Sequence, residues 1–227
     1  MKILVSIFVL FIFVVPNGWA TPFTGSISNE GGTLIATGGW NGLGKIDSNP
    51  DSILSWTVDY NSITKLWTYS YTFTVDEKGI SHVIIELSNP FTDPNFVASA
   101  GYDIGAPKTY TPDYSDTGDN PWMPGNLYGI KWNSGGVTIF NFSIVTIKEP
   151  MWGDFYSKDG KDGGAAVTAW NKYFGSNTTA DIGDGNAGGW VLVPDTGQTV
   201  PEPATMFLLG SGLLGMAGYA KRKLKRN

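Results

Sequence analysis

The chain has 227 residues, with 30 glycines and no cysteine. Residues 21–200 carry nine Lys against nineteen Asp and Glu, a net charge of −10, whereas the five charges after Tyr219 are all basic. This acidic balance argues against a nucleic-acid partner, and the absence of Cys and Arg from residues 21–200 excludes disulfides, thiolate chemistry and guanidinium clamps there.

The first twenty residues are typical of a secretory signal peptide. Lys2 precedes an apolar run over residues 3–15, and the small residues Gly18 and Ala20 fit the −3 and −1 positions of a cleavage site. The run is shorter than the roughly 20 residues that span a bilayer. We therefore predict cleavage after Ala20 rather than a retained membrane anchor.

Residues 21–193 show an apolar period of two, which is typical of half-buried strands. The clearest example is the alternation of Trp67, Tyr69, Tyr71, Phe73 and Val75 with Thr and Ser. Other predicted strands cover residues 33–37, 54–60, 80–87, 128–132, 137–147 and 190–193. Turn-rich joints between many strands predict an all-β domain, an antiparallel β-sandwich of the jelly-roll kind.

One short helix is predicted over residues 164–174, where Val167, Trp170, Tyr173 and Phe174 have amphipathic spacing. Residues 194–200, with Pro194, Gly197 and Gln198, are predicted to be a linker after the domain.

The last 27 residues, 201–227, contain three successive parts. Pro201, Glu202 and Pro203 come first, an apolar Gly-rich segment over residues 206–220 follows, and a Lys/Arg cluster ends the chain. Two prolines around one residue keep that motif extended, out of either a sheet or a helix. The apolar segment predicts one transmembrane helix, and the basic cluster places the C-terminus in the cytoplasm.

In this order the three parts resemble the PEP-CTERM sorting signal of Gram-negative bacteria. The resemblance implies an exosortase as partner, cleavage near Pro201-Glu202-Pro203 after a single-pass inner-membrane intermediate, and transfer to the cell surface or an exopolysaccharide matrix. Residues 80–87 and 152–160 also resemble stretches in extracellular domains of other PEP-CTERM proteins, from which no activity carries over.

Catalytic chemistry has few candidates in the domain. His82 is the one side chain there that titrates near neutrality when unperturbed, and Ser81 points to the opposite face of a strand, so the two cannot form a nucleophile and base pair. Glycoside hydrolysis needs two carboxylates across a cleft, and Glu86, Glu149 and Asp154 are available for it.

Two kinds of binding site are also compatible with the sequence. Asp181, Asp184 and Asn186 lie in a Gly-rich turn and form a weak candidate for structural calcium, although the EF-hand pattern is absent. The rings of Trp122, Trp152 and Tyr156 fall in loop-like stretches and are candidates for stacking on sugars. The predicted carbohydrate site uses Trp152, Asp154, Tyr156 and Asp159.

The favoured interpretation is a non-enzymatic surface or matrix protein with a structural or adhesive role, with no cofactor except possible structural calcium. Two alternatives stay open, a carbohydrate-binding module and a secreted glycoside hydrolase. An extracellular polysaccharide is the partner that both of them share.

Overall fold

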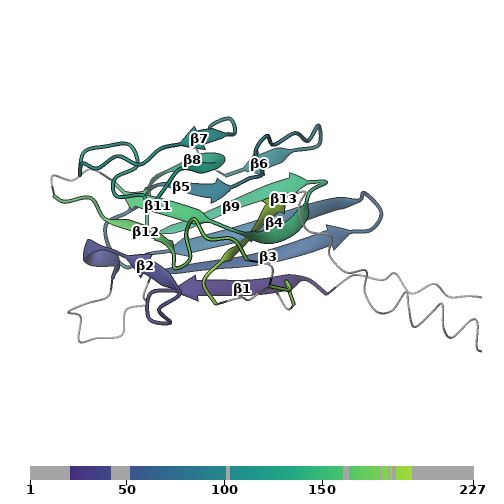
Figure 1. The fold of residues 1–227 in the computed structure, drawn as a ribbon, viewed down its shortest axis with the longest axis horizontal. Coiled ribbons are helices and arrows are strands. Elements are labelled where there is room, and N and C mark those ends of the chain that lie inside the picture. The colour runs from purple at the N-terminus through teal and green to yellow at the C-terminus, as the bar shows by residue number, and fades with distance from the viewer. Residues whose placement is uncertain are drawn as a thin grey trace, which may run out of the picture.

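A computed structural model describes residues 21–41, 52–100, 103–160, 164–178, 180–183, 185 and 188–195. These residues form thirteen strands and one 3-10 helix, η1 (Gly38–Trp40), and among them there is no α-helix (Figure 1). None of the described helices is long and apolar enough to cross a membrane. The predicted signal peptide and the predicted segment at 201–227 lie outside the described residues.

The first sheet has five antiparallel strands in the order β1-β3-β4-β9-β6. Its strands are β1 (Phe23–Ser28), β3 (Ile53–Asn61), β4 (Leu66–Thr74), β9 (Ile139–Thr146) and β6 (Val97–Ser99). Strands β3 and β4 form a hairpin in which the Asn61 side chain accepts hydrogen bonds from the N–H groups of Ile63 and Thr64, at 2.9 and 3.0 Å. An Asn that bonds to the backbone ahead of it in this way is a turn signal, which fixes the register of the two long strands.

The second sheet has six antiparallel strands in the order β2-β12-β11-β5-β8-β7. They are β2 (Leu34–Ala36), β12 (Thr168–Asn171), β11 (Phe155–Asp159), β5 (Ile80–Glu86), β8 (Leu127–Val137) and β7 (Lys108–Tyr110). A separate antiparallel pair joins β10 (Glu149–Gly153) to β13 (Val191–Asp195). The prediction of an all-β domain with antiparallel sheets is confirmed; the jelly-roll connectivity stays a prediction.

The main core lies between the inner faces of the two larger sheets. Aromatic residues alternate with Thr and Ser in β4, so one face of this strand is apolar. On that face Trp67, Tyr69, Tyr71 and Phe73 are all buried. Across the interface the ring of Phe73 meets that of Phe155 in β11 at 5.1 Å between centroids. Aromatic side chains remove a large apolar area from water, so these contacts supply much of the driving force for pairing the sheets.

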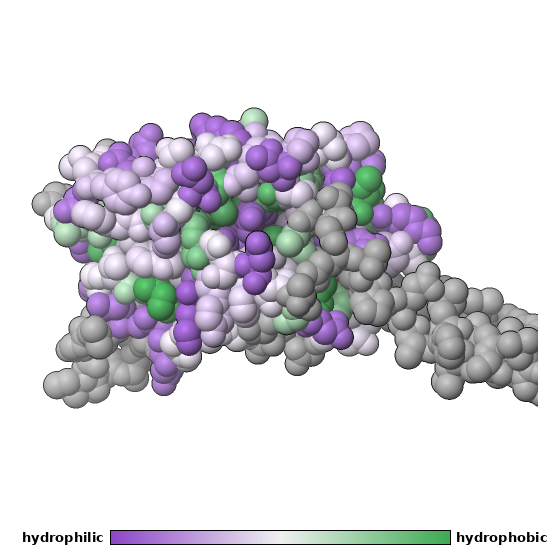
Figure 2. Space-filling model, viewed as in Figure 1, coloured by the Kyte–Doolittle hydropathy of each residue, from purple (hydrophilic) through white to green (hydrophobic). Residues whose placement is uncertain are grey.

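A second, smaller core covers the outer face of the six-stranded sheet. It consists of Ile84, Tyr110, Met123, Leu127 and Tyr156, with Trp170 and Phe174 packed against it. Strands β5 and β11 therefore bury both of their faces, in part under the chain that connects β7 to β8. Figure 2 shows that the visible surface is mostly hydrophilic, with small and separate apolar areas.

The predicted helix over residues 164–174 is wrong, because the segment contains strand β12, which pairs with both β11 and β2. Val167 belongs to the main core, whereas Trp170 and Phe174 pack against the outer one. Residues three apart lie on opposite faces of a strand but on one face of a helix, so the same spacing misled the prediction. Strand β13 also includes Pro194 and Asp195, which the prediction placed in the linker.

Candidate functional site

The four residues of the predicted carbohydrate site do not lie in a loop. Trp152 is in β10, Tyr156 and Asp159 are in β11, and Asp154 joins the two strands. Their exposed fractions are 4% for Trp152, 5% for Asp154, 0% for Tyr156 and 3% for Asp159. Because a ring stacks on a sugar only through an open face, neither aromatic offers the surface that the prediction assumed, and the loop placement is wrong.

These side chains are occupied by contacts within the domain. The Trp152 indole N–H donates to the carbonyl of Ala180 at 3.2 Å. Asp154 accepts hydrogen bonds from the Asn171 side chain at 2.9 Å and from the Gly175 N–H at 2.7 Å. Burial raises the pKa of the Asp154 carboxyl, and those two hydrogen bonds oppose the rise. Asp154 therefore ties β12 and its following turn to the β10–β11 junction.

The carboxylates considered for hydrolysis are placed as follows. Glu86 accepts the backbone N–H of Asp154 through Oε2 at 2.8 Å, so the Glu86 carboxylate contacts the main chain of Asp154. Glu149 lies at the start of β10 and is exposed. The Asp154 carboxylate is held by its two donors and points to β12 and the turn that follows. These contacts stabilise the fold.

The other candidates are mostly outside the described residues, namely Asp184 and Asn186 of the calcium turn and Pro201, Glu202 and Pro203 of the sorting motif. Asp181 is exposed, and its side chain accepts the Gly183 N–H at 3.3 Å. Among the described residues there is no group of three or more His, Asp or Glu that could hold a metal ion.

Two side chains of β11 fix the loop between β7 and β8 on the outer face of the sheet. The Tyr156 hydroxyl donates to the carbonyl of Pro121 at 2.6 Å, and the buried Lys158 ammonium donates to the carbonyl of Gly118 at 3.0 Å. The loop also closes on itself, because the N–H of Asp113 donates to Asn120 O and the N–H of Trp122 donates to Asp113 O, both at 2.9 Å. Residues 111–122 are thus held by these hydrogen bonds against the outer face of the sheet.

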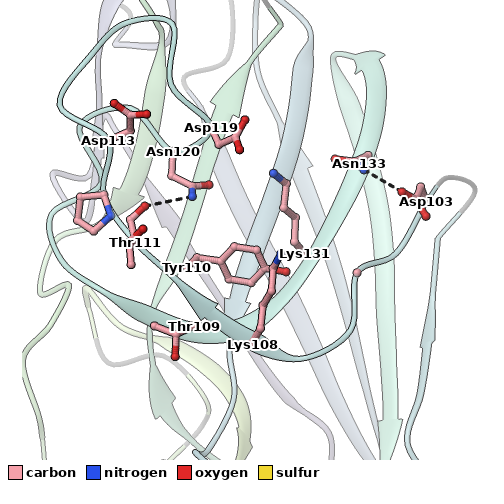
Figure 3. A pocket seen from close by; sticks show the side chains of 12 residues that line it. Asp103, Lys108, Thr109, Tyr110, Thr111, Asp113, Asp119, Asn120, Lys131 and Asn133 are labelled. Carbon is pink, nitrogen blue, oxygen red and sulfur yellow. Dashed lines mark hydrogen bonds between the residues drawn. The ribbon is translucent and has the colours of Figure 1, made fainter.

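A pocket of about 470 Å³ opens between this loop and strands β7 and β8, and we name it the β7–β8 pocket. Its walls are residues 108–113 with Asp119 and Asn120, the segment around Asp103 and Gly105, and Lys131 and Asn133 of β8 (Figure 3). Lys131 and Asn133 reach it because Ile130 and Trp132, which alternate with them, face the main core.

Two polar side chains of the pocket wall are almost fully buried. Tyr110 and Asn120 are only 5% and 6% exposed, and they lie against the Lys131 backbone and the His82 side chain, respectively. The Asn120 amide group is held in place by its Nδ2 atom, which donates to the Thr111 carbonyl at 3.2 Å. These contacts hold the two side chains in the wall of the pocket, because a buried polar group is stable only where it has polar neighbours.

Charges of both signs surround these two side chains. Lys131 is half-buried, and burial lowers the pKa of its ammonium group; Asp119 opposes that shift, and Lys158 and Lys108 add to it. The Lys108 ammonium lies 5.2 Å from the centre of the Tyr110 ring, so it covers one face of that ring. Figure 3 shows Lys131 extending toward the side of the pocket where Asp119 and Asn120 lie.

His82 lies next to the pocket, on the outer face of β5. It pairs in register with Lys158 on one side and Asn133 on the other, and its side chain lies against that of Asn120. Burial lowers the pKa of His82 well below its ordinary value, the cations Lys131 and Lys158 lower it further, and a hydrogen bond with the Asn120 side chain opposes the shift. His82 is therefore a neutral imidazole at neutral pH.

The loop also carries two exposed aromatic rings. Trp122 is 46% exposed and Tyr114 is 75% exposed. The backbone of Trp122 has φ of 55°, a left-handed conformation that is rare for a bulky residue, and its indole N–H donates to Asp116 Oδ1 at 2.7 Å. Of the three aromatic residues predicted to stack on sugars, Trp122 is thus the exposed one.

The prediction from sequence missed Tyr110 and Lys131 of the pocket, whereas it named Asn120 as a polar neighbour of Trp122. One signal existed for Lys131, because it is the charged residue in the predicted strand over residues 128–132. A charged residue at a half-buried position of a strand is stabilised by polar neighbours, and part of these come from a loop that lies close only after folding.

Residues 199–223 match the family described as the PEP-CTERM protein-sorting motif. No curated protein and no solved structure matches the chain.

Proposed function

We propose that the chain is exported, that an exosortase recognises it through Pro201, Glu202 and Pro203, and that its β domain then has a structural or adhesive role at the cell surface or in the extracellular matrix. The match of residues 199–223 to the PEP-CTERM sorting motif carries this proposal. The motif implies processing by an exosortase and a cell-surface fate. Its three parts also fit a membrane intermediate of a Gram-negative bacterium, with residues 206–220 in the inner membrane.

The β domain is proposed to act without catalysis. Asp154, the best placed of the hydrolase candidates, is engaged by Asn171 and Gly175. His82 is buried among lysines and next to residues that hold the loop. An assay of the purified protein on exopolysaccharide checks this part, since release of reducing ends that is lost in Asp154→Asn would contradict it.

Processing in a bacterium that carries an exosortase tests the sorting role. An antibody against the β domain would follow the chain by immunoblot in membrane, surface and medium fractions, with and without the exosortase gene. We expect a shortened form at the surface, and accumulation of the full-length chain in the membrane when the enzyme is absent or when Glu202 is changed to Gln. Glu30→Gln, an exposed acid in the turn after β1, is the matched control. Equal processing in both strains would refute the proposal.

A further inference from the structure

We infer that the turn between β3 and β4 inserts into the surface of the lipid bilayer while the chain is held in the membrane. The inference rests on the proposed function, because the membrane intermediate places residues 206–220 in the bilayer. The turn, residues 61–66, projects at one end of the five-stranded sheet (Figure 1). It carries Ile63, whose side chain is 90% exposed, the most of any large hydrophobic side chain among the described residues.

The last described residue lies at the same end of the domain as this turn. Strand β9 runs toward the turn and ends at Thr146, which pairs with Trp67 near the start of β4. The chain then turns into β10, which begins at Glu149, and β13 ends at Asp195 opposite Glu149. The domain therefore presents the β3–β4 turn on the side from which the sequence continues to the sorting motif.

The stretch of sequence between the domain and the apolar segment is short. Residues 196–205 alone separate Asp195 from the segment over residues 206–220. A fully extended chain spans at most about 3.6 Å per residue, so Asp195 lies no more than about 40 Å from the start of that segment. A short tether also gives the turn a high effective concentration at the membrane surface.

The turn is built without help from the Ile63 side chain. Asn61 accepts hydrogen bonds from the N–H groups of Ile63 and Thr64 through its side chain, and its carbonyl accepts from the Lys65 N–H at 2.8 Å. Lys65 has a φ of 61°, the left-handed conformation that closes the turn. Turn positions of this kind usually carry polar residues or Gly, so an exposed Ile here is not explained by the local fold.

The chemistry of the turn fits a lipid surface. Lys65 is the one charged residue in the sequence of residues 61–66, and there is no acid among them. An aliphatic side chain beside a lysine suits the interface, where Ile63 enters the acyl region and the long Lys65 stem reaches the headgroups. Ile147, which follows Thr146 and is 43% exposed, is a second apolar side chain at this end.

These contacts are too few for a stable protein interface, which buries about 800 Å² on each partner. Transfer of one exposed Ile out of water raises a partition constant by about ten- to a hundredfold. Such a factor gives weak binding to a free domain but suffices for one that is already held at the membrane. Cleavage near the sorting motif removes the tether, so docking is confined to the membrane intermediate.

Fluorescent probes on single cysteines test the inference, because the chain has no cysteine of its own. The full-length chain is reconstituted in phosphatidylcholine vesicles that carry a nitroxide quencher on the lipid headgroup. Thr64→Cys places the probe on the turn, and Ile139→Cys places it on an exposed site at the opposite end of β9. We expect the quencher to reduce the emission of the probe at position 64 and to leave that at position 139 unchanged.

A second substitution in the Thr64→Cys chain identifies the side chain responsible. Ile63→Asp should lower the ratio of docked to free turn at least about tenfold, so that quenching of the probe falls to the level seen at position 139. Ile139→Asp, which adds the same charge at another exposed Ile, is the matched control and should leave the quenching unchanged. Both sites are exposed, so neither substitution removes a core contact.

The inference is overturned if the two probes are quenched equally, if neither is quenched, or if Ile63→Asp has no effect. Quenching that appears only when exosortase is added to the vesicles also overturns it and assigns the turn to a protein contact. Vesicle flotation separates this inference from the proposed function. A chain that does not float contradicts the membrane intermediate and docking together, whereas a floating chain with an unquenched turn contradicts docking alone. Quenching as expected, with equal processing in strains with and without exosortase, contradicts only the sorting.

Discussion

Substitution of Asp154 tests whether this residue has a structural role or a ligand-binding role. It is 5% exposed and accepts the Asn171 side-chain N–H at 2.9 Å and the Gly175 N–H at 2.7 Å. In Asp154→Ala the Gly175 N–H loses its acceptor, whereas the Asn171 amide keeps a second one, the Gly189 carbonyl at 3.3 Å. The variant therefore loses one hydrogen bond entirely and part of another.

The size of the effect follows from those two bonds. A hydrogen bond to a charged group contributes about 1.5 to 3 kcal/mol, so we expect Asp154→Ala to lower the free energy of unfolding by about 3 kcal/mol. This is a large fraction of the roughly 5 to 15 kcal/mol that stabilises a typical domain. It corresponds to a fall of about 1 to 2 M in the urea midpoint.

The pH dependence has a definite sign. Burial raises the pKa of Asp154 above its ordinary value of 3.8, so the folded chain binds this proton more tightly than the unfolded chain does. The stability that Asp154 contributes is greatest below pH 3.8 and falls as the pH rises through the raised pKa. The advantage of the parent chain over Asp154→Asn should therefore shrink over that window.

Urea unfolding of the full-length chain, followed by tryptophan fluorescence in acidic and neutral buffers, measures both effects. Asp59→Ala, an exposed acid in β3, is the control and should change stability by less than about 0.5 kcal/mol. An unchanged urea midpoint in Asp154→Ala, combined with loss of sugar binding, would refute the structural role and support the role predicted from sequence.

Three further predictions use the same unfolding assay. Tyr71→Phe removes a buried hydroxyl that donates at 2.7 Å to a carbonyl of β13, and it should cost about 1 kcal/mol; no change would mean that β13 is held by other contacts. Gly129→Ala places a Cβ 2.1 Å from the Ile85 carbonyl oxygen and should cost about 1 to 3 kcal/mol, whereas Gly160→Ala, where the nearest atom is 3.9 Å away, should cost far less; equal effects would contradict the steric reason. Burial acts to raise the pKa of Asp93, but hydrogen bonds from Thr146 and two backbone N–H groups outweigh burial and lower the pKa. The stability that Asp93 adds is therefore lost as the pH falls through that lowered value. We expect the stability of Asp93→Asn to depend less on acidic pH than that of the parent chain, and an unaltered pH dependence would contradict this explanation.

The strands of the main core could be predicted from sequence because their physics is local. In β3 and β4 the alternation of aromatic and hydroxyl residues reports directly which side chains face the other sheet. The prediction that residues 152–159 form a loop was wrong for a different reason. Gly153 and Asp154 look like turn residues, but a Cβ at Gly153 would lie 2.4 Å from the Val193 side chain, so the glycine is there to let β13 approach.

The candidate pocket could not be predicted, because its parts meet only in the folded chain. Tyr110 comes from an edge strand, Asn120 from a loop, and Lys131 from a central strand. The loop is placed by hydrogen bonds from Tyr156 and Lys158, whose carbonyl acceptors carry no side-chain signature. Contacts between residues far apart in the chain produce no periodic pattern in the sequence.

The alternation along β5 has a consequence for how such domains diverge. Val83 and Ile85 face the main core, whereas His82 and Ile84 face the loop side, one position apart on the same strand. Substitutions at even positions can therefore remodel the outer face while the odd positions keep the two sheets together. One scaffold could in this way acquire many different surface specificities through changes confined to every second residue and a single covering loop.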